Sequence, residues 1–331
     1  MSIFLGIDTS CYTTSVAAVS ADGRLLADLR QVLRVGTGER GLQQSAAVFQ
    51  HVQNLPSLLE EISGLVDLRN VCGIAASTRP RPVTGSYMPV FTVSAGQARI
   101  MAQVLRVPLV ETSHQEGHLT AGIWSAGGPG QAKFLAVHLS GGTTELLLVE
   151  REPGQDNNGQ AMFDITLLGG TTDLHAGQFI DRVGVRLGIP FPAGPGLELL
   201  ARQGTQGRGL IPAAVQGYEL SFSGPESQAQ RLIERGTPPE QVARAVEVCI
   251  AKSLLKLMRH GLAEHRVKEV LVVGGVAANQ FIRSEVRQRL DRDGVKACFA
   301  DPSLSSDNAV GVALTARQII QAGSVRADAG G

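Results

Sequence analysis

A strand, a short polar turn and a second strand occur twice in this chain, and this repeat restricts the fold more than any other feature. The first copy is FLGIDTSCYTTSVAAVS at 4–20, and the second is KFLAVHLSGGTTELLLVERE at 133–152. Each copy is followed by segments with helical spacing of apolar residues and by further buried strands. The sequence therefore predicts a duplicated α/β fold, with two lobes and a central cleft.

The predicted elements divide into an N-terminal lobe over 1–110 and a C-terminal lobe over 111–320, whose last helix can return to the first lobe. Residues 321–331 are small and polar, which predicts a flexible tail. The Pro- and Gly-rich 188–201 and the polar, exposed 220–227 are expected to be connections, and the alternative is that such a loop forms the wall of a binding pocket. Helices are expected over 42–63, 94–107, 175–188, 238–265, 276–290 and 306–320, and buried strands over 71–77, 108–112, 269–275 and 296–301.

Composition and charge exclude several classes of protein. The 30 basic and 30 acidic residues balance, so any RNA contact must come from a local patch or from a partner subunit. The cysteines are too far apart for a disulfide scaffold or a thiolate zinc site; they are Cys11, Cys72, Cys249 and Cys298. No signal peptide and no apolar run of membrane-spanning length is visible, so we expect a cytoplasmic protein with no membrane contact.

The segment HQEGH at 114–118 places two histidines one helical turn apart, where they can share a metal ion. A zinc protease needs glutamate directly after the first histidine, but this place holds Gln115, and Glu116 lies roughly 200° around a helix. The spacing therefore excludes a protease. Asp307 offers a third ligand that suits iron or zinc. The alternative is that His114 and His118 are surface residues and Asp307 a helix cap.

Two glycine turns are candidates for binding an anion. HLSGGTTE at 138–145 lies at the tip of the second hairpin, and VVGGVAAN at 272–279 joins a buried strand to a helix. Glycine allows backbone amides to approach a phosphate closely. The alternative for the first is an ordinary hairpin turn. Neither turn matches the dinucleotide-binding or phosphate-loop patterns.

Seven segments occur in the order of one family: GIDTSC, HQEGH, LSGGTTEL, FIDRVGVRLGIPFPAGP, LSFSG, GGVAAN and SSDNA. Over about residues 1–320 the chain resembles the tRNA N6-threonylcarbamoyladenosine synthase family. The resemblance implies the actin-like ATPase (RNase H-like) fold. It implies an acyltransferase that moves a threonylcarbamoyl group from threonylcarbamoyl-adenylate to N6 of adenosine 37, in tRNAs that read ANN codons. Partner subunits of a synthase complex are also implied.

The resemblance assigns residues to two sites. His114, His118 and Asp307 correspond to the ligands of one divalent metal, iron or zinc. The site for the adenylate, a nucleotide of the ATP type, corresponds to His138, Leu139, Ser140, Gly141, Gly142, Asp181, Gly194 and Asn279. No catalytic residue is identified.

Departures from the family pattern fall at polar positions near these sites. The first turn lacks its acidic residues, the glycine turn lacks a histidine, and an acid replaces a lysine. An acidic pair before the central helix keeps one member, Asp173, and that helix lacks a glutamate. The residues found at the changed positions are Tyr12, Thr13, Thr143, Leu174, Gln178 and Glu226. Such changes favour an alternative, a non-catalytic or altered paralogue that binds nucleotide and metal in a regulatory or scaffold role. A small-molecule kinase is less favoured, because no general-base aspartate is identified.

Overall fold

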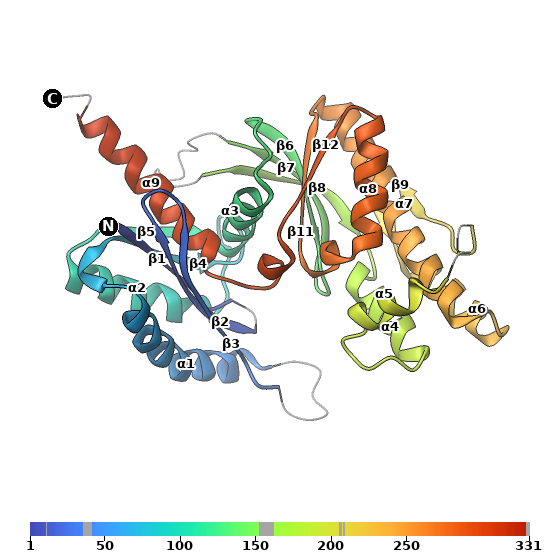
Figure 1. Ribbon diagram of the computed structural model, residues 1–331, viewed down its shortest axis with the longest axis horizontal. Coiled ribbons are helices and arrows are strands. Elements are labelled where there is room, and N and C mark those ends of the chain that lie inside the picture. The colour runs from blue at the N-terminus through green and yellow to red at the C-terminus, as the bar shows by residue number, and fades with distance from the viewer. Residues whose placement is uncertain (11, 36–41, 152–161, 205–206, 208, 329–331) are drawn as a thin grey trace. The chain divides into compact units, whose positions relative to one another are not determined.

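The computed structural model describes residues 1–10, 12–35, 42–151, 162–204, 207 and 209–328 of the chain (Figure 1). These residues form two compact units. The first comprises Met1–Trp124, Arg151–Asp164 and Ser306–Gly331, and the second comprises Ser125–Glu150 and Ile165–Ser305. The first unit thus extends to Trp124 instead of ending near residue 110, because strand β5 and helix α3 pack within it.

The first unit contains a five-stranded sheet of order β3-β2-β1-β4-β5, counted over the described residues. Strands β1, β2 and β3 form an antiparallel meander, and β4 and β5 run parallel to β1. The strands are β1 (Ile3–Asp8), β2 (Thr13–Ser20), β3 (Leu25–Val32), β4 (Val71–Arg79) and β5 (Leu109–Ser113). Since β1 and β2 are buried along their whole length, both faces of this sheet are covered.

Alternate residues of β1 contact different helices. Leu5 and Ile7 belong to a core shared with α1 (Gln44–Leu65) and α2 (Phe91–Leu105). On the other face, a Cβ added at Gly6 would lie 2.4 Å from the Ala313 backbone nitrogen of α9 (Val310–Asp328). Helix α9 also contacts β4 and β2, so the end of the chain completes the first unit (Figure 1).

The last helix differs at both ends from the prediction of 306–320. It begins at Val310, whose amide donates to the Asn308 side chain, and it continues to Asp328. It therefore includes most of the segment expected to be a flexible tail, while 329–331 lies outside the described residues. Small residues at Ala309, Ala313 and Ala316 are buried where the helix crosses the sheet.

The second unit repeats the strand order of the first. Its sheet, over the described residues, has the order β12-β11-β6-β7-β8-β10-β9. A β6–β7 hairpin is antiparallel, and β11 and β12 follow parallel to β6, as β4 and β5 follow β1. The strands are β6 (Lys133–Leu139), β7 (Thr144–Glu150), β8 (Asp164–Thr171), β9 (Ala214–Gln216), β10 (Glu219–Ser221), β11 (Glu269–Val273) and β12 (Lys296–Phe299). The predicted duplication is therefore confirmed.

Two segments that we expected to be connections contain helices. They are α5 (Gly194–Ala201) and α6 (Ser223–Glu234), and Phe222 just before α6 is fully buried and stacks on Phe179 at 5.5 Å. The Pro and Ser residues in their first turns predicted loops, because the same residue types are common in turns and at helix N-termini. The remaining helices are α4 (Ala176–Arg186), α7 (Pro239–His265), α8 (Gln280–Arg292) and short 3₁₀ turns η1 (Leu68–Asn70), η2 (Gly275–Ala278) and η3 (Pro302–Leu304).

Candidate metal centre and nucleotide pocket

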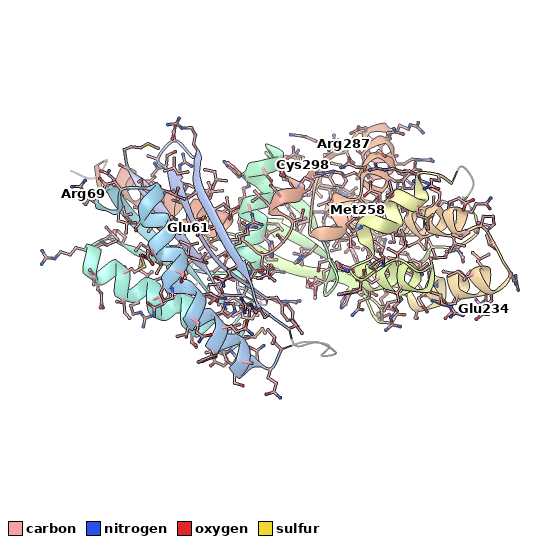
Figure 2. The ribbon with its side chains drawn as sticks, turned by 60° about the horizontal axis from the view of Figure 1, so that its bottom comes forward. Glu61, Arg69, Glu234, Met258, Arg287 and Cys298 are labelled. Carbon is pink, nitrogen blue, oxygen red and sulfur yellow. The ribbon has the colours of Figure 1, made fainter. Side chains whose placement is uncertain are left out.

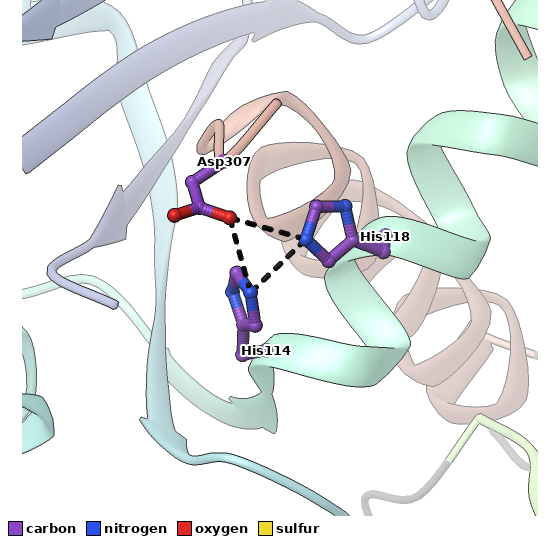
Figure 3. Close-up of side chains that lie close together, drawn as sticks. All are labelled: His114, His118 and Asp307. Atoms are coloured by element: carbon purple, nitrogen blue, oxygen red, sulfur yellow. Dashed lines mark hydrogen bonds and ion pairs between the residues drawn. The ribbon is translucent and has the colours of Figure 1, made fainter. Parts of the chain in front are cut away.

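Three side chains of the first unit converge on one point. Helix α3 (His114–Ala126) begins directly after β5, so His114 and His118 lie one turn apart at its start, and Asp307 lies three residues before α9. The two Nε2 atoms are 3.0 Å apart, and each is 3.5 Å from Asp307 Oδ1 (Figure 3). The three residues predicted from the sequence are thus brought together by an α3–α9 contact.

The donor atoms of this group fit a divalent metal. Tetrahedral bonds of about 2.0–2.1 Å place neighbouring ligand atoms roughly 3.3 Å apart, close to the spacing found here. Two imidazoles and a carboxylate suit zinc or iron alike. The surface alternative is wrong, because the side chains of His118 and His114 are only 6% and 15% exposed. The capping alternative is also wrong, because Asn308 accepts the hydrogen bond from Val310.

Asp8, at the end of β1, orients the first histidine. Its Oδ2 is 3.3 Å from His114 Nδ1, and its carboxylate also accepts hydrogen bonds from the hydroxyls of Ser10 and Ser77. A carboxylate on one ring nitrogen fixes the tautomer and leaves the other nitrogen free to ligate a metal. Sequence reasoning missed Asp8, although an acid that ends an otherwise apolar buried strand is a signal of this kind.

Opposite charges in this group shift the pKa values of His114 and Asp307 in opposite directions. Burial opposes protonation of His114, but the Asp8 charge and hydrogen bonds to Asp307 and Asp8 outweigh it and raise its pKa well above 6.5. Burial would raise the pKa of Asp307, yet hydrogen bonds from His114 and His118 hold it far below 3.8. A metal ion at this position would have to displace a proton from His114, so its binding would weaken as the pH falls.

Glu116, the acid within HQEGH, has a structural role. Its buried carboxylate accepts hydrogen bonds from the amide and hydroxyl of Ser113, at 2.8 and 2.7 Å, and from the Thr112 hydroxyl at 3.1 Å. A negative carboxylate in the first turn of a helix is also stabilised by the positive end of the helix dipole. This side chain holds the β5–α3 corner that positions the two histidines, in agreement with its predicted direction away from them.

A hollow of about 340 Å³ in the second unit contains four of the eight residues assigned to the nucleotide. They come from the β6–β7 turn, α4, the start of α5 and the residue before α8, and they are Gly141, Asp181, Gly194 and Asn279. Pro192 and Pro195 also line it, so 188–201 forms a pocket wall rather than a simple connection. The remaining lining includes Gly177, Glu198 and Gly275.

The β6–β7 turn presents fewer free amides than its glycines suggest. The Ser140 hydroxyl accepts the amides of Gly142 and Thr143, at 3.3 and 3.0 Å. Helix α4 packs directly on this turn, since a Cβ at Gly177 would lie 2.6 Å from Gly141 Cα. Leu139 lies in the hydrophobic core and His138 in the same strand, so of this segment only Gly141 lines the hollow.

Asn279 is held rigidly at the rim of the hollow. Its side-chain oxygen accepts the Ile282 amide at 2.9 Å, and its side-chain nitrogen donates to buried Glu247 at 2.7 Å. Glu247 also pairs with Arg244 at 2.7 Å. Burial raises the pKa of Glu247 to about 7 from 4.5, against the Asn279 hydrogen bond and the Arg244 charge.

This pKa predicts a pH-dependent stability. Because the folded pKa is the higher one, the contribution of Glu247 is complete below pH 4.5 and is lost as the pH rises to about 7. The difference corresponds to up to about 3 kcal/mol. We expect the free energy of unfolding of wild type to fall relative to Glu247→Gln over this range, measured by urea unfolding. The exposed Glu61 provides the matched control, Glu61→Gln (Figure 2). Parallel curves for wild type and Glu247→Gln would contradict this prediction.

Comparison with known proteins agrees with this architecture. The family model for tRNA N6-adenosine threonylcarbamoyltransferase matches residues 38–314. This chain belongs to that family. An enzyme of that name from Thermus thermophilus is 32% identical over 319 residues, covering 94% of this chain and 91% of the relative. One from Archaeoglobus fulgidus is 29% identical over 313 residues, covering 95% and 90%.

Solved structures with lower identity share the fold. Component A of the Acidaminococcus fermentans (R)-2-hydroxyglutaryl-CoA dehydratase aligns with a TM-score of 0.55 at 18% identity, covering 96% of this chain and 98% of its own. A ROK-family glucokinase from Streptomyces griseus aligns with a TM-score of 0.53 at 15% identity, covering 96% and 99%. The predicted actin-like ATPase fold is therefore confirmed. Among the described residues, no helix has the length and apolar character needed to span a bilayer.

Proposed function

We propose that this chain transfers a threonylcarbamoyl group from threonylcarbamoyl-adenylate to N6 of adenosine 37, in tRNAs that read ANN codons. It acts in the cytoplasm with partner subunits and one divalent metal, iron or zinc. The observation that carries the proposal is the His114, His118 and Asp307 group in a chain of this family. In this transfer N6 forms a bond to the carbamoyl carbon, and the bond from that carbon to the phosphate oxygen breaks. Adenosine monophosphate then leaves with the electron pair, and N6 loses a proton.

The first unit supplies the metal side of this proposal. His114, His118 and Asp307 would hold the ion, and Asp8 would keep His114 in the tautomer that ligates. A divalent cation there supplies positive charge that stabilises the oxygens of an acyl phosphate. Buried Glu116 keeps the start of α3 in place, so that the two imidazoles are already positioned.

The second unit supplies the nucleotide side. Asp181 uses one oxygen to accept the Ala193 amide at 2.8 Å. Within the described part of the chain its other oxygen has no hydrogen-bond partner, so it would accept from a ribose hydroxyl. Asn279 has one side-chain N–H beyond its bond to Glu247. Glycines without a Cβ allow the base or sugar to lie against the backbone. These features support a nucleoside ligand in this hollow.

One observation favours the alternative of a non-catalytic paralogue. Two side chains at positions of family departures form local hydrogen bonds. Gln178 accepts the His175 amide at 3.1 Å, and Glu226 accepts from Gln230 at 2.8 Å. Asp173, directly before Leu174, accepts the Ser221 hydroxyl at 2.5 Å and the Phe222 amide at 3.0 Å. Such a chain would bind nucleotide and metal in a regulatory or scaffold role.

A transfer assay separates these functions. Full chain with its copurified partner subunits is supplied with threonylcarbamoyl-adenylate and unmodified ANN-reading tRNA, and the tRNA nucleosides are analysed by mass spectrometry. We expect the modified adenosine to form. The matched control is the same tRNA with guanosine at position 37, which has no N6 amine and should give no product. Metal and nucleotide binding without product would favour the paralogue.

A further inference from the structure

Six cationic side chains gather over helices α7 and α8 of the second unit. They line two hollows, of about 560 and 440 Å³, that share Arg259 and therefore adjoin. We call this set the basic face: Lys252, Lys256, Arg259, Arg266, Lys268 and Arg289. Three of the five lysines of the whole chain lie in it. Charge is thus concentrated here in a chain whose overall charge is zero.

Helical spacing explains the row along α7. Lys252, Lys256 and Arg259 are separated by four and three residues, so they project from one side of the helix and are exposed. The other side is apolar, and Met258 lies inside the unit (Figure 2). Arg266 follows the last turn in a left-handed conformation, with φ of 53°. The row from Lys252 to Arg266 therefore extends about 21 Å along the helix axis.

Most of this charge is not neutralised. Two acids line the hollows, Asp293 at 2.7 Å from Arg259 and Glu285 at 3.1 Å from Arg289. The remaining cations have no carboxylate partner within the described parts of the chain; they are Lys252, Lys256, Arg266 and Lys268. Six cations and two acids leave a net charge of +4 on this face.

The arrangement fits a ligand with repeated negative charges. Cations spread along a row do not converge on a single point, as they would around one small anion. A nucleic-acid backbone offers phosphates at regular intervals, and exposed lysines and arginines neutralise them one by one. Protein interfaces are enriched in aromatic residues and depleted in lysine, and no aromatic residue lines either hollow. Membrane-binding helices also use exposed aromatic and leucine side chains, which this face lacks.

We propose that the basic face binds the sugar-phosphate backbone of RNA, without reading its sequence. Given the proposed function, on which this inference rests, the RNA is the tRNA substrate. The face provides the local patch that a neutral chain needs for an RNA contact. Binding through it depends strongly on salt, because each neutralised phosphate releases counterions.

The test measures the Kd of full-length protein for tRNA by fluorescence anisotropy, at several salt concentrations. The variant K252Q/K256Q/R266Q/K268Q removes the four cations without a carboxylate partner. We expect the variant to bind tRNA at least roughly tenfold more weakly than wild type near 0.1 M salt. The slope of a plot of log Kd against log salt concentration should be smaller by about 3. The control R69Q/R186Q/R231Q/R235Q removes the same charge outside the face and should retain the wild-type slope. Unchanged circular dichroism confirms folding of both.

Failure of the basic-face proposal and failure of the proposed transfer give different results. If the four substitutions leave the tRNA affinity and slope unchanged, or if wild type binds anionic vesicles or acidic proteins but not tRNA, the basic-face proposal is overturned. The proposed transfer would stand if product still formed in the first case. Loss of tRNA binding in the variant, with wild type unable to form product in the transfer assay, supports the basic face and overturns the proposed transfer.

Discussion

Asp307→Ala is expected to leave the chain without a bound metal and to reduce threonylcarbamoyl transfer by a hundredfold or more, and His114→Ala is expected to do the same. Each substitution removes one of three donors that lie within 4.8 Å of one another. Two remaining protein ligands bind a divalent ion far more weakly than three. Metal content is measured by inductively coupled plasma mass spectrometry on purified protein, with one ion per chain expected for wild type.

Two further variants show whether the effect is specific. Asp8→Asn keeps all three ligands but weakens the contact to His114 Nδ1, so we expect metal affinity to fall about 10- to 100-fold without abolition of binding. His260→Ala removes a half-exposed histidine of the second unit and should leave metal content unchanged. A wild-type chain purified without metal, or metal retained by Asp307→Ala, would contradict the assigned site.

Gly311→Ala is expected to destabilise the first unit and to weaken metal binding together. A Cβ at this position would lie 1.8 Å from the carbonyl oxygen of Gly117, so helices α3 and α9 would have to separate. Overpacking of this kind costs roughly 1–3 kcal/mol or more. Gly117 lies between the two histidines, and Gly311 follows Asp307 by four residues, so a separation moves the ligands apart. Urea unfolding and metal titration measure the two effects.

Another glycine provides the control for helix propensity. Gly64 lies in helix α1, and a Cβ there would meet no atom within 4 Å. Gly64→Ala should raise the free energy of unfolding by up to about 1 kcal/mol and leave metal affinity unchanged. If Gly311→Ala has wild-type stability and affinity, the close α3–α9 contact is not what assembles the site.

Local patterns predicted much of the fold. The helix expected over 238–265 is α7 (Pro239–His265), and the hairpin meander at the start is β1, β2 and β3, because long amphipathic helices and alternating strands have strong periodicity. The helices starting at Gly194 and Ser223 were missed, since proline, glycine and serine occur in both turns and helix starts. Periodicity could not assign the short strands β9 and β10, which have three residues each.

By itself the sequence determined the types of ligand in the candidate metal site and the spacing of its two histidines. His114 and His118 lie one turn apart on any helix formed there, and Gln115 excludes a protease from residue chemistry alone. Only the tertiary structure decided that Asp307, nearly two hundred residues later, faces them and that Asp8 lies behind them. The physical reason is that α9 packs closely on the first sheet at Gly6 and on α3 at Gly311, where a Cβ would clash. Local spacing carries no information on such long-range packing.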